Sequence, residues 1–301
     1  MKAVDVINRY RESYKNWLYV MRHMRAGTEN IMCILKNGEK IELNREIAAY
    51  LSHILMFHEI SAEKIEEMLS TGILEFVYNQ RTLKMKIYEK SQISGDIGPI
   101  FWGSEYSFLT GEDAVILDIG ANIGDSVIYF SLNGAREVIA IEPYPYSFEI
   151  AKFNVAVNNL NGKIHLYNLG YGRNRKMRLD NRVTTAGNDL VEADKGEYVE
   201  IMSLESLLKE FLREDVKQFH LKMDCEGCEY ALLDEKRDVF DKLDKIQLEY
   251  HYGLRGLDKF LKGLGFNVKF TKPVDSYNPY ASEPHMQVGY LYAERTPQKQ
   301  N

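Results

Sequence analysis

VILDIGANIGDSV, the stretch from Val115 to Val127, closes an apolar run on a carboxylate and follows it with a turn that holds two glycines. The run before Asp118 is almost entirely aliphatic, as a parallel strand buried on both faces requires. Gly120 and Gly124 let the backbone of the turn come close to a neighbouring group. The next residues read as a short helix that ends at Gly134. A strand, a glycine turn and a helix in this order predict the first unit of a doubly wound α/β sheet.

Apolar strands and amphipathic helices then alternate to the end of the chain. Further strands are predicted at residues 137–143, 163–170, 219–224, 245–250 and 288–294. Helices are predicted at 144–160, 204–212 and 230–236, and a helix followed by a strand at 257–270. Pro145 suits the first turn of one helix and Ser203 can cap another. This alternation is typical of a sheet with mainly parallel strands, which binds its ligands at the carboxyl ends of those strands.

Residues 1–90 follow a different pattern, which predicts a smaller α+β domain. Apolar residues recur at helical spacing as far as Arg25. Asn37 and Gly38 lie between two short apolar runs, the commonest signal of a two-residue hairpin, and Ser61 can cap a later helix. Gly, Ser and Pro then concentrate in residues 91–103. We therefore expect an accessory domain at 1–90 and the α/β domain at 91–301.

The composition excludes several classes of protein. The chain has 301 residues, 45% of them hydrophobic, and a formal net charge of −6 that gives no broad basic field for nucleic acid. No apolar run is long enough to cross a bilayer, and the charged N-terminus differs from a signal peptide. Three cysteines do not suggest a secreted disulfide framework. We expect a cytoplasmic protein with no membrane span, and the net charge does not favour a nucleic-acid partner; the sequence does not address the oligomeric state.

The carboxylate at the end of the first strand indicates the ligand. A dinucleotide-binding turn presents backbone amides to a pyrophosphate, which Asp118 would repel. The same carboxylate would attract an ammonium and a sulfonium charge, and S-adenosylmethionine carries both. Glu142, which ends the next strand, is placed to accept hydrogen bonds from the ribose hydroxyls. Asn168, which ends the third strand, is a further candidate near the adenine.

A third motif, LKMDCEGCEYALL at Leu221–Leu233, adds a family resemblance. From about residue 105 to 270 the chain resembles the FkbM-like family of S-adenosylmethionine-dependent methyltransferases. The residues that carry the resemblance are Asp118, Gly120, Ala121, Asn122, Gly124, Glu142, Pro143, Leu221, Lys222, Asp224, Glu226, Gly227, Glu229, Glu249 and His251. The resemblance implies a class I, Rossmann-like methyltransferase with a seven-stranded sheet. The cofactor-binding candidates are Asp118, Gly120, Ala121, Asn122, Gly124, Glu142, Pro143 and Asn168.

Candidates for catalysis follow from the chemistry of methyl transfer. Transfer from a sulfonium is an in-line displacement, and a hydroxyl nucleophile also needs a base. The candidate bases at the ends of the fourth and fifth strands are Asp224, Glu226, Glu249 and His251. Their carboxylates could raise one pKa or bind a divalent cation, and His251 could simply bond a backbone carbonyl. The sequence leaves these options open and assigns no metal ligand; Glu229 is expected in a first helical turn.

Cys225 and Cys228 stand at two variable positions of the third motif and make a C-x-x-C pair. A zinc site would need a second close pair, and a redox role competes with the chemistry that already explains the motif. We interpret both as structural thiols. Their position suggests the hypothesis that oxidation lowers activity.

The resemblance implies O-methylation of a sugar or glycan-like hydroxyl, with a small-molecule or glycan acceptor. The main alternative is transfer to a nitrogen of nucleic acid or protein; the acidic balance and the absence of an N-P-P-Y-like motif count against it. Aminopropyl transfer would suit Asp224 and its acidic neighbours. A binding module without turnover is the alternative from another class, because a fold does not prove activity. The intact Asp118, Glu142 and Asp224 argue against it.

Overall fold

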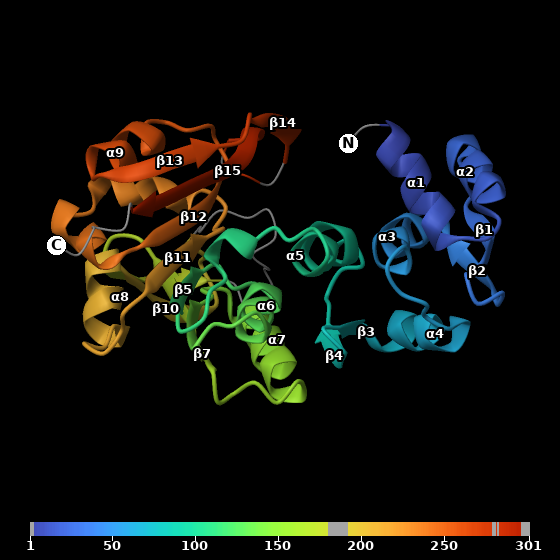
Figure 1. Ribbon diagram of the computed structural model, residues 1–301, viewed down its shortest axis with the longest axis horizontal. Coiled ribbons are helices and arrows are strands. Elements are labelled where there is room, and N and C mark those ends of the chain that lie inside the picture. Colours follow the sequence, from blue (N-terminus) through green and yellow to red (C-terminus); the bar gives the residue numbers. More distant parts are fainter. Residues whose placement is uncertain (1–2, 180–191, 279–280, 282, 296–301) are drawn as a thin grey trace. The chain divides into compact units, whose positions relative to one another are not determined.

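The computed structural model describes residues 3–179, 192–278, 281 and 283–295. Contacts between Cα atoms divide the chain into two compact units, Met1–Glu105 and Tyr106–Asn301. Each unit has its own secondary structure (Figure 1). Among the described helices, none is long and apolar enough to cross a membrane.

The first unit begins with four helices and two hairpins. These helices are α1 (Ala3–Ser13), α2 (Trp17–Ala26), α3 (Arg45–Leu55) and α4 (Ala62–Thr71). The hairpins pair β1 (Asn30–Ile34) with β2 (Lys40–Asn44), and β3 (Ile73–Tyr78) with β4 (Arg81–Lys86). The hairpin expected at Asn37 and Gly38 is therefore present, and Ser61 caps α4 by accepting a hydrogen bond from the Lys64 amide. The expected N-terminal helix is broken near Tyr14, which bridges to Leu35 and donates to the Ala48 carbonyl.

The first unit ends after Glu105 rather than near residue 90. The intervening segment forms a π-helical turn at Ile93–Ile97 and α5 (Gly98–Phe101). Its aromatic side chains belong to the first unit, since the Phe101 ring lies 5.1 Å from Phe76 and the Trp102 ring stacks 5.7 Å from Phe57. Gly and Pro in this segment mark a helix start, and the apolar residues around them hold it to the preceding core.

The second unit is built on one large, mainly parallel sheet (Figure 1). Its strands are β5 (Val115–Ile119), β6 (Glu137–Ile141), β7 (Ile164–Tyr167), β11 (Phe219–Met223), β12 (Lys245–Tyr250), β13 (Phe266–Phe270) and β15 (His285–Arg295), in the order β13-β15-β12-β11-β5-β6-β7. Strand β15 runs antiparallel to its neighbours, and β14 (Val274–Tyr277) pairs with it as an eighth strand. A smaller sheet joins β8 (Leu169–Tyr171), β10 (Glu197–Met202) and β9 (Arg175–Leu179). The predicted doubly wound α/β class is confirmed.

Helices cover both faces of the sheet, and one face carries the buried charged residues Asp118 and Lys222. The helices are α6 (Asp125–Leu132), α7 (Pro145–Val157), α8 (Leu204–Phe211) and α9 (Leu257–Gly263), with 3-10 turns η2 (Ser107–Leu109), η3 (Cys228–Asp234) and η4 (Arg237–Lys242). Apolar side chains of α8, η3, η4 and α9 form one core with alternate residues of the central strands, such as Leu117 and Leu221. Because strand side chains alternate between faces, Asp118 and Lys222 point to the opposite face, where α6 packs.

Candidate functional site

A buried ion pair lies at the centre of the sheet. Asp118 on β5 and Lys222 on β11 are opposite each other in register, with 2.9 Å between Oδ1 and Nζ and almost no exposed surface. Ser126 of α6 donates a hydrogen bond of 2.5 Å to Asp118. Burial alone would lower the pKa of Lys222, but the charges of Asp118 and Asp224 raise it to about 12. The Asp118 charge is thus balanced within the protein, and its contact with a ligand ammonium stays a prediction.

The two glycines of the turn are required by packing within the protein. Gly120 has φ +85°, and a Cβ there would lie 1.9 Å from the carbonyl oxygen of Asp224. Gly124 has φ +83°, and its Cβ would come within 3.3 Å of Ala151 on α7. Lys222 also donates a 2.7 Å hydrogen bond to the Gly120 carbonyl. The sequence predicts that these glycines serve a ligand; the structure adds the closeness of Asp224, which follows β11, and of helix α7.

Glu142 and Asn168 join the turn to the ends of β6 and β7. The two oxygens of the buried Glu142 carboxylate accept 2.9 Å hydrogen bonds from the amides of Asn122 and Tyr144. The side-chain amide of Asn168 donates to the carbonyls of Glu142 and Pro143, at 2.8 and 2.9 Å. The structure therefore brings together the cofactor candidates of the three strands, while their contacts with ribose and adenine stay predictions.

The hydrogen bonds of the turn suit a cofactor without phosphate. The amides of Gly120 and Ala121 both donate to the Ile141 carbonyl, at 3.0 and 3.1 Å. The Asn122 amide is held by Glu142, and the Gly124 amide donates to the Ala121 carbonyl at 2.7 Å. A dinucleotide site needs such amides free to face a pyrophosphate. The residues of this turn consequently fit S-adenosylmethionine better than a dinucleotide.

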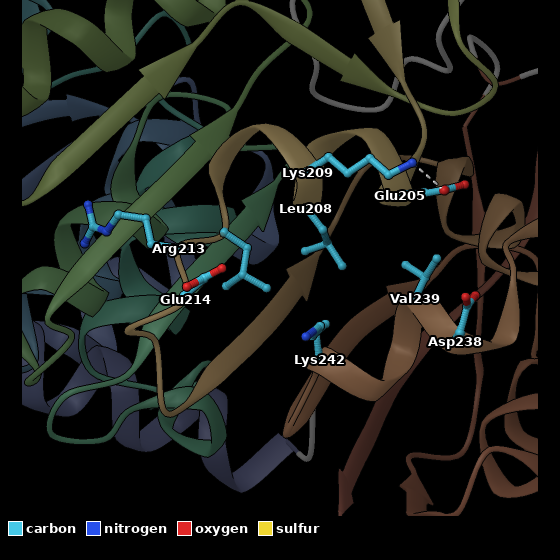
Figure 2. A pocket seen from close by; sticks show the side chains of 9 residues that line it. Glu205, Leu208, Lys209, Arg213, Glu214, Asp238, Val239 and Lys242 are labelled. Carbon is cyan, nitrogen blue, oxygen red and sulfur yellow. Dashed lines mark hydrogen bonds and ion pairs between the residues drawn. The ribbon is translucent and has the colours of Figure 1, made fainter.

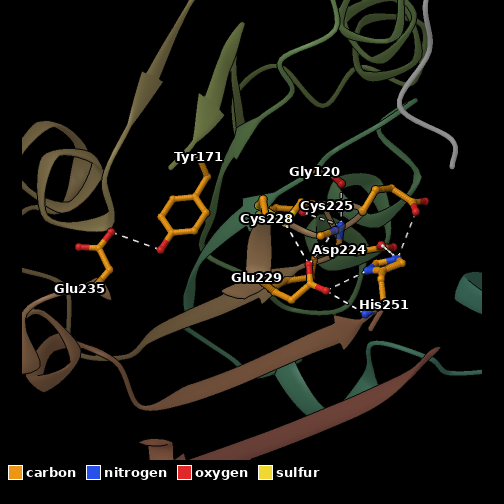
Figure 3. The surroundings of a disulfide bond; sticks show 12 residues. Gly120, Tyr171, Asp224, Cys225, Cys228, Glu229, Glu235 and His251 are labelled. Atoms are coloured by element: carbon orange, nitrogen blue, oxygen red, sulfur yellow. Dashed lines mark hydrogen bonds and ion pairs between the residues drawn. A yellow bond between two sulfur atoms is a disulfide. The ribbon is translucent and has the colours of Figure 1, made fainter. Parts of the chain in front are cut away.

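The four candidate bases meet at the carboxyl ends of β11 and β12. His251 Nε2 lies 3.3 Å from Glu226 Oε2 and 3.8 Å from Asp224 Oδ1. Figure 3 shows the His251 ring turned toward Asp224. Tyr106, which the sequence analysis missed because it lies in no motif, donates from its hydroxyl to Asp224 Oδ2 at 3.2 Å. The side chains of Asp224, Glu226 and Glu249 are partly exposed, so a substrate can reach this cluster.

His251 is held by a second buried carboxylate. Glu229 lies in the first turn of η3, as expected, but its Oε1 accepts from the His251 amide at 2.8 Å and lies 3.2 Å from His251 Nδ1. Burial alone would lower the pKa of His251, but Glu229, Glu226 and Asp224 raise it to about 10. The ring is therefore positively charged near neutral pH, and the carboxylates rather than His251 are available to accept a proton.

The same place could hold a divalent cation. Ligand atoms of Asp224, Glu249 and His251 all lie within 4.8 Å of one another. Carboxylate oxygens and an imidazole suit several divalent metals. The sequence left this option open, and these are the three residues that would supply the ligands, with His251 giving up its ring proton as the metal binds.

The C-x-x-C pair forms a disulfide, so the interpretation of both residues as thiols is wrong. Cys225 and Cys228 are bonded, with their Cα atoms 5.4 Å apart (Figure 3). The loop folds back because Glu226 and Gly227 both have positive φ, which brings the two sulfurs together. Sequence spacing alone could not show this turn. Cys33, in the first unit, is a free and buried cysteine.

A separate hollow lies between α8 and η4 (Figure 2). It has a volume of about 300 Å³, and apolar Leu208, Leu212 and Val239 are among the residues that line it. Charged side chains line it too, among them Lys209, which is paired with Glu205 at 2.6 Å. None of the predicted site residues lines this hollow, so we place the candidate site at the strand ends.

Comparison with known proteins agrees with the motifs. Residues 118–268 match the family described as the methyltransferase FkbM domain. The match begins at Asp118 and includes every cofactor-binding and catalytic candidate. It therefore covers the glycine turn, the Glu142 strand end and the cluster around Asp224.

Solved structures show similarity at low sequence identity. One is a precorrin-6y C5,15-methyltransferase from Geobacter metallireducens, 20% identical, with a TM-score of 0.38 over 64% of this chain and 87% of that one. Another is TYW2 of M. jannaschii in complex with AdoMet, 16% identical, with a TM-score of 0.41 over 75% and 88%. TrmK of M. capricolum in complex with S-adenosyl-homocysteine is 12% identical, with a TM-score of 0.38 over 65% and 68%.

Proposed function

Because the chain belongs to the FkbM family of S-adenosylmethionine-dependent methyltransferases, we propose that it methylates a hydroxyl group of a sugar or glycan-like acceptor. The observation that supports a hydroxyl is the group of carboxylates at the ends of β11 and β12. An alcohol must lose its proton as it attacks the methyl group, and a carboxylate in contact with the acceptor can take that proton.

We assign the proton-accepting role to Asp224. Its side chain is 29% exposed, and Tyr106 hydrogen-bonds one of its oxygens, which fixes its direction. Glu226 and Glu249 lie beside it and would orient further hydroxyls of the acceptor. Bound S-adenosylmethionine supplies the methyl group, and the turn from Asp118 to Gly124 with Glu142 would hold it in line with the acceptor.

An acceptor screen tests this proposal. Formation of S-adenosylhomocysteine is measured with glycosides, oligosaccharides, RNA, DNA and proteins, each with and without Mg²⁺. We expect turnover with a glycoside, and we expect Asp224→Asn to lose about a hundredfold of it. Asp234→Asn is the matched control, because Asp234 is an exposed carboxylate paired with Arg173. Turnover with nucleic acid or protein alone would overturn the proposed acceptor.

Cofactor binding is measured first and separately. Calorimetric titration with S-adenosylhomocysteine should show binding that Glu142→Gln weakens about tenfold, since the amide can no longer accept hydrogen bonds at both positions. We assign an accessory role to the first unit and a cytoplasmic location to the protein. Expression of a fluorescent fusion tests the location.

A further inference from the structure

Glu229 is a fully buried carboxylate that the proposed reaction does not use. It lies where η3 begins and has no exposed surface. Asp224, Glu226, Glu249 and His251, which we call the acceptor site, lie next to it. An ionised carboxylate is costly to bury unless hydrogen bonds compensate it. The hydrogen bonds that Glu229 accepts therefore indicate its role.

Both oxygens of Glu229 are engaged, each with a different loop. Oε1 accepts the His251 amide at 2.8 Å and faces His251 Nδ1 at 3.2 Å, at the end of β12. Oε2 accepts the Gly227 amide at 2.9 Å, in the loop that follows β11. Figure 3 shows Glu229 between the disulfide loop and His251. One side chain thus joins the two loops that carry the candidate base and its neighbours.

The donors around Glu229 explain why the residue is a carboxylate. Donors converge on both of its oxygens, and a glutamine would have to turn its NH₂ group toward one of them. With Nδ1 facing Glu229, the other ring nitrogen of His251 faces Glu226 and Asp224. The Gly227 amide fixes the turn in which Glu226 has a φ of +55°, and so the direction of the Glu226 side chain.

We propose that Glu229 is the positioning residue of the acceptor site: it holds the His251 ring and the Glu226–Gly227 turn in the arrangement in which His251 Nε2 faces Glu226 and Asp224. The part of this proposal that concerns catalysis rests on the proposed function. Glu229 itself touches neither the acceptor nor the cofactor. Its effect passes through His251 and the turn.

The side-chain placement is tested by NMR without any acceptor. In protein labelled with ¹⁵N-histidine, we expect a slowly exchanging ring proton on Nδ1 of His251, assigned by its absence in His251→Gln. Glu229→Gln should lose this signal. His220 is the internal control, because its Nδ1 lies 2.9 Å from the Leu109 carbonyl in the same unit, and its signal should remain. Persistence of the His251 signal in Glu229→Gln would overturn the proposal.

The second readout separates positioning from general folding. Titration of S-adenosylhomocysteine into Glu229→Gln should give a Kd within about twofold of wild type, while kcat with the acceptor from the screen falls about a hundredfold. Equal losses in both would mean a structural role and contradict the proposal. Should Glu229→Gln fail to fold, Glu229→Asp takes its place, since it keeps the charge and withdraws the oxygens from His251. A wild-type enzyme that methylates no glycoside would refute the proposed function and leave the NMR result standing.

Discussion

The two units of the chain bury different kinds of polar group. Among residues 3–105, the buried polar side chains are Ser13, Ser52 and Gln92, which carry no charge. In the second unit, buried ionisable side chains include Asp118, Asp125, Glu142, His220, Lys222, Glu229 and His251. A charge is expensive to remove from water and is retained where it is paired or has a function. This difference indicates that the functional site lies in the second unit, because ionisable groups with perturbed pKa values gather at functional sites.

Removing one buried charge should have the largest effect. Lys222→Met would leave Asp118 buried without its partner, so we expect a loss of about 3–5 kcal/mol in the free energy of unfolding. Urea denaturation measures it, with hydrogen exchange of β5 and β11 as a local readout. Lys209→Met, which breaks an exposed pair with Glu205, should cost far less, because water screens that pair. Adding Asp118→Asn to Lys222→Met should recover part of the loss; no recovery would mean that the pair does not explain it.

Adding a side chain at a glycine of the turn should have the second-largest effect. Gly120→Ala places a methyl group against the Asp224 carbonyl at a positive φ, which alone costs about 1–2 kcal/mol. We expect loss of S-adenosylhomocysteine binding in calorimetry. Gly162→Ala is the matched control, because nothing lies within 4 Å of its Cβ position and its φ is not positive. Retained binding in Gly120→Ala would contradict the close approach of the turn to β11.

The sequence predicts the sheet of the second unit, and the place where its ligand binds stays a prediction. The apolar run before Asp118 and the alternation after it indicate the sheet, because buried parallel strands leave that pattern. Partners brought together from distant parts of the chain could not be predicted: Lys222 opposite Asp118 depends on register, and Tyr106 reaches Asp224 from outside every motif. The first unit ends at Glu105 rather than at the expected residue 90, because Phe101 and Trp102 pack on aromatic side chains that precede them in the chain.

The cysteines of the two units should differ in their reaction with a thiol reagent. Burial raises the pKa of Cys33 in the first unit to about 12, so its thiol is not reactive near neutral pH. Cys225 and Cys228 are joined by a disulfide. A thiol reagent should therefore label no cysteine of the native protein, and should label Cys225 and Cys228, but not Cys33, after mild reduction. Mass spectrometry of the labelled peptides checks this, and labelling of Cys33 in the folded protein would contradict it.

Reduction also tests the hypothesis about oxidation. The disulfide loop carries Glu226 and Gly227, which contact His251 and Glu229. We expect Cys225→Ser combined with Cys228→Ser to lower methyl transfer by less than about tenfold, since Glu229 still holds the loop. Peroxide added to the reduced wild type should restore the disulfide and lower methyl transfer, and it should leave the double variant unaffected. An equal response of both proteins would place the sensitivity elsewhere.

The smallest expected effect is a pH dependence confined to the first unit. Burial, together with the charge of Arg9, lowers the pKa of His53 to about 4. Because the unfolded chain has the ordinary pKa near 6.5, protonation favours unfolding. Stability is complete above pH 6.5 and is lost as the pH falls toward 4. Hydrogen exchange of α3, corrected for intrinsic rates, should therefore be faster at pH 5 than at pH 7. His53→Gln should reduce this difference. The control His23→Gln, in α2, should not. An unchanged pH dependence in His53→Gln would show that the burial of neutral His53 does not cause the pH dependence of the first unit.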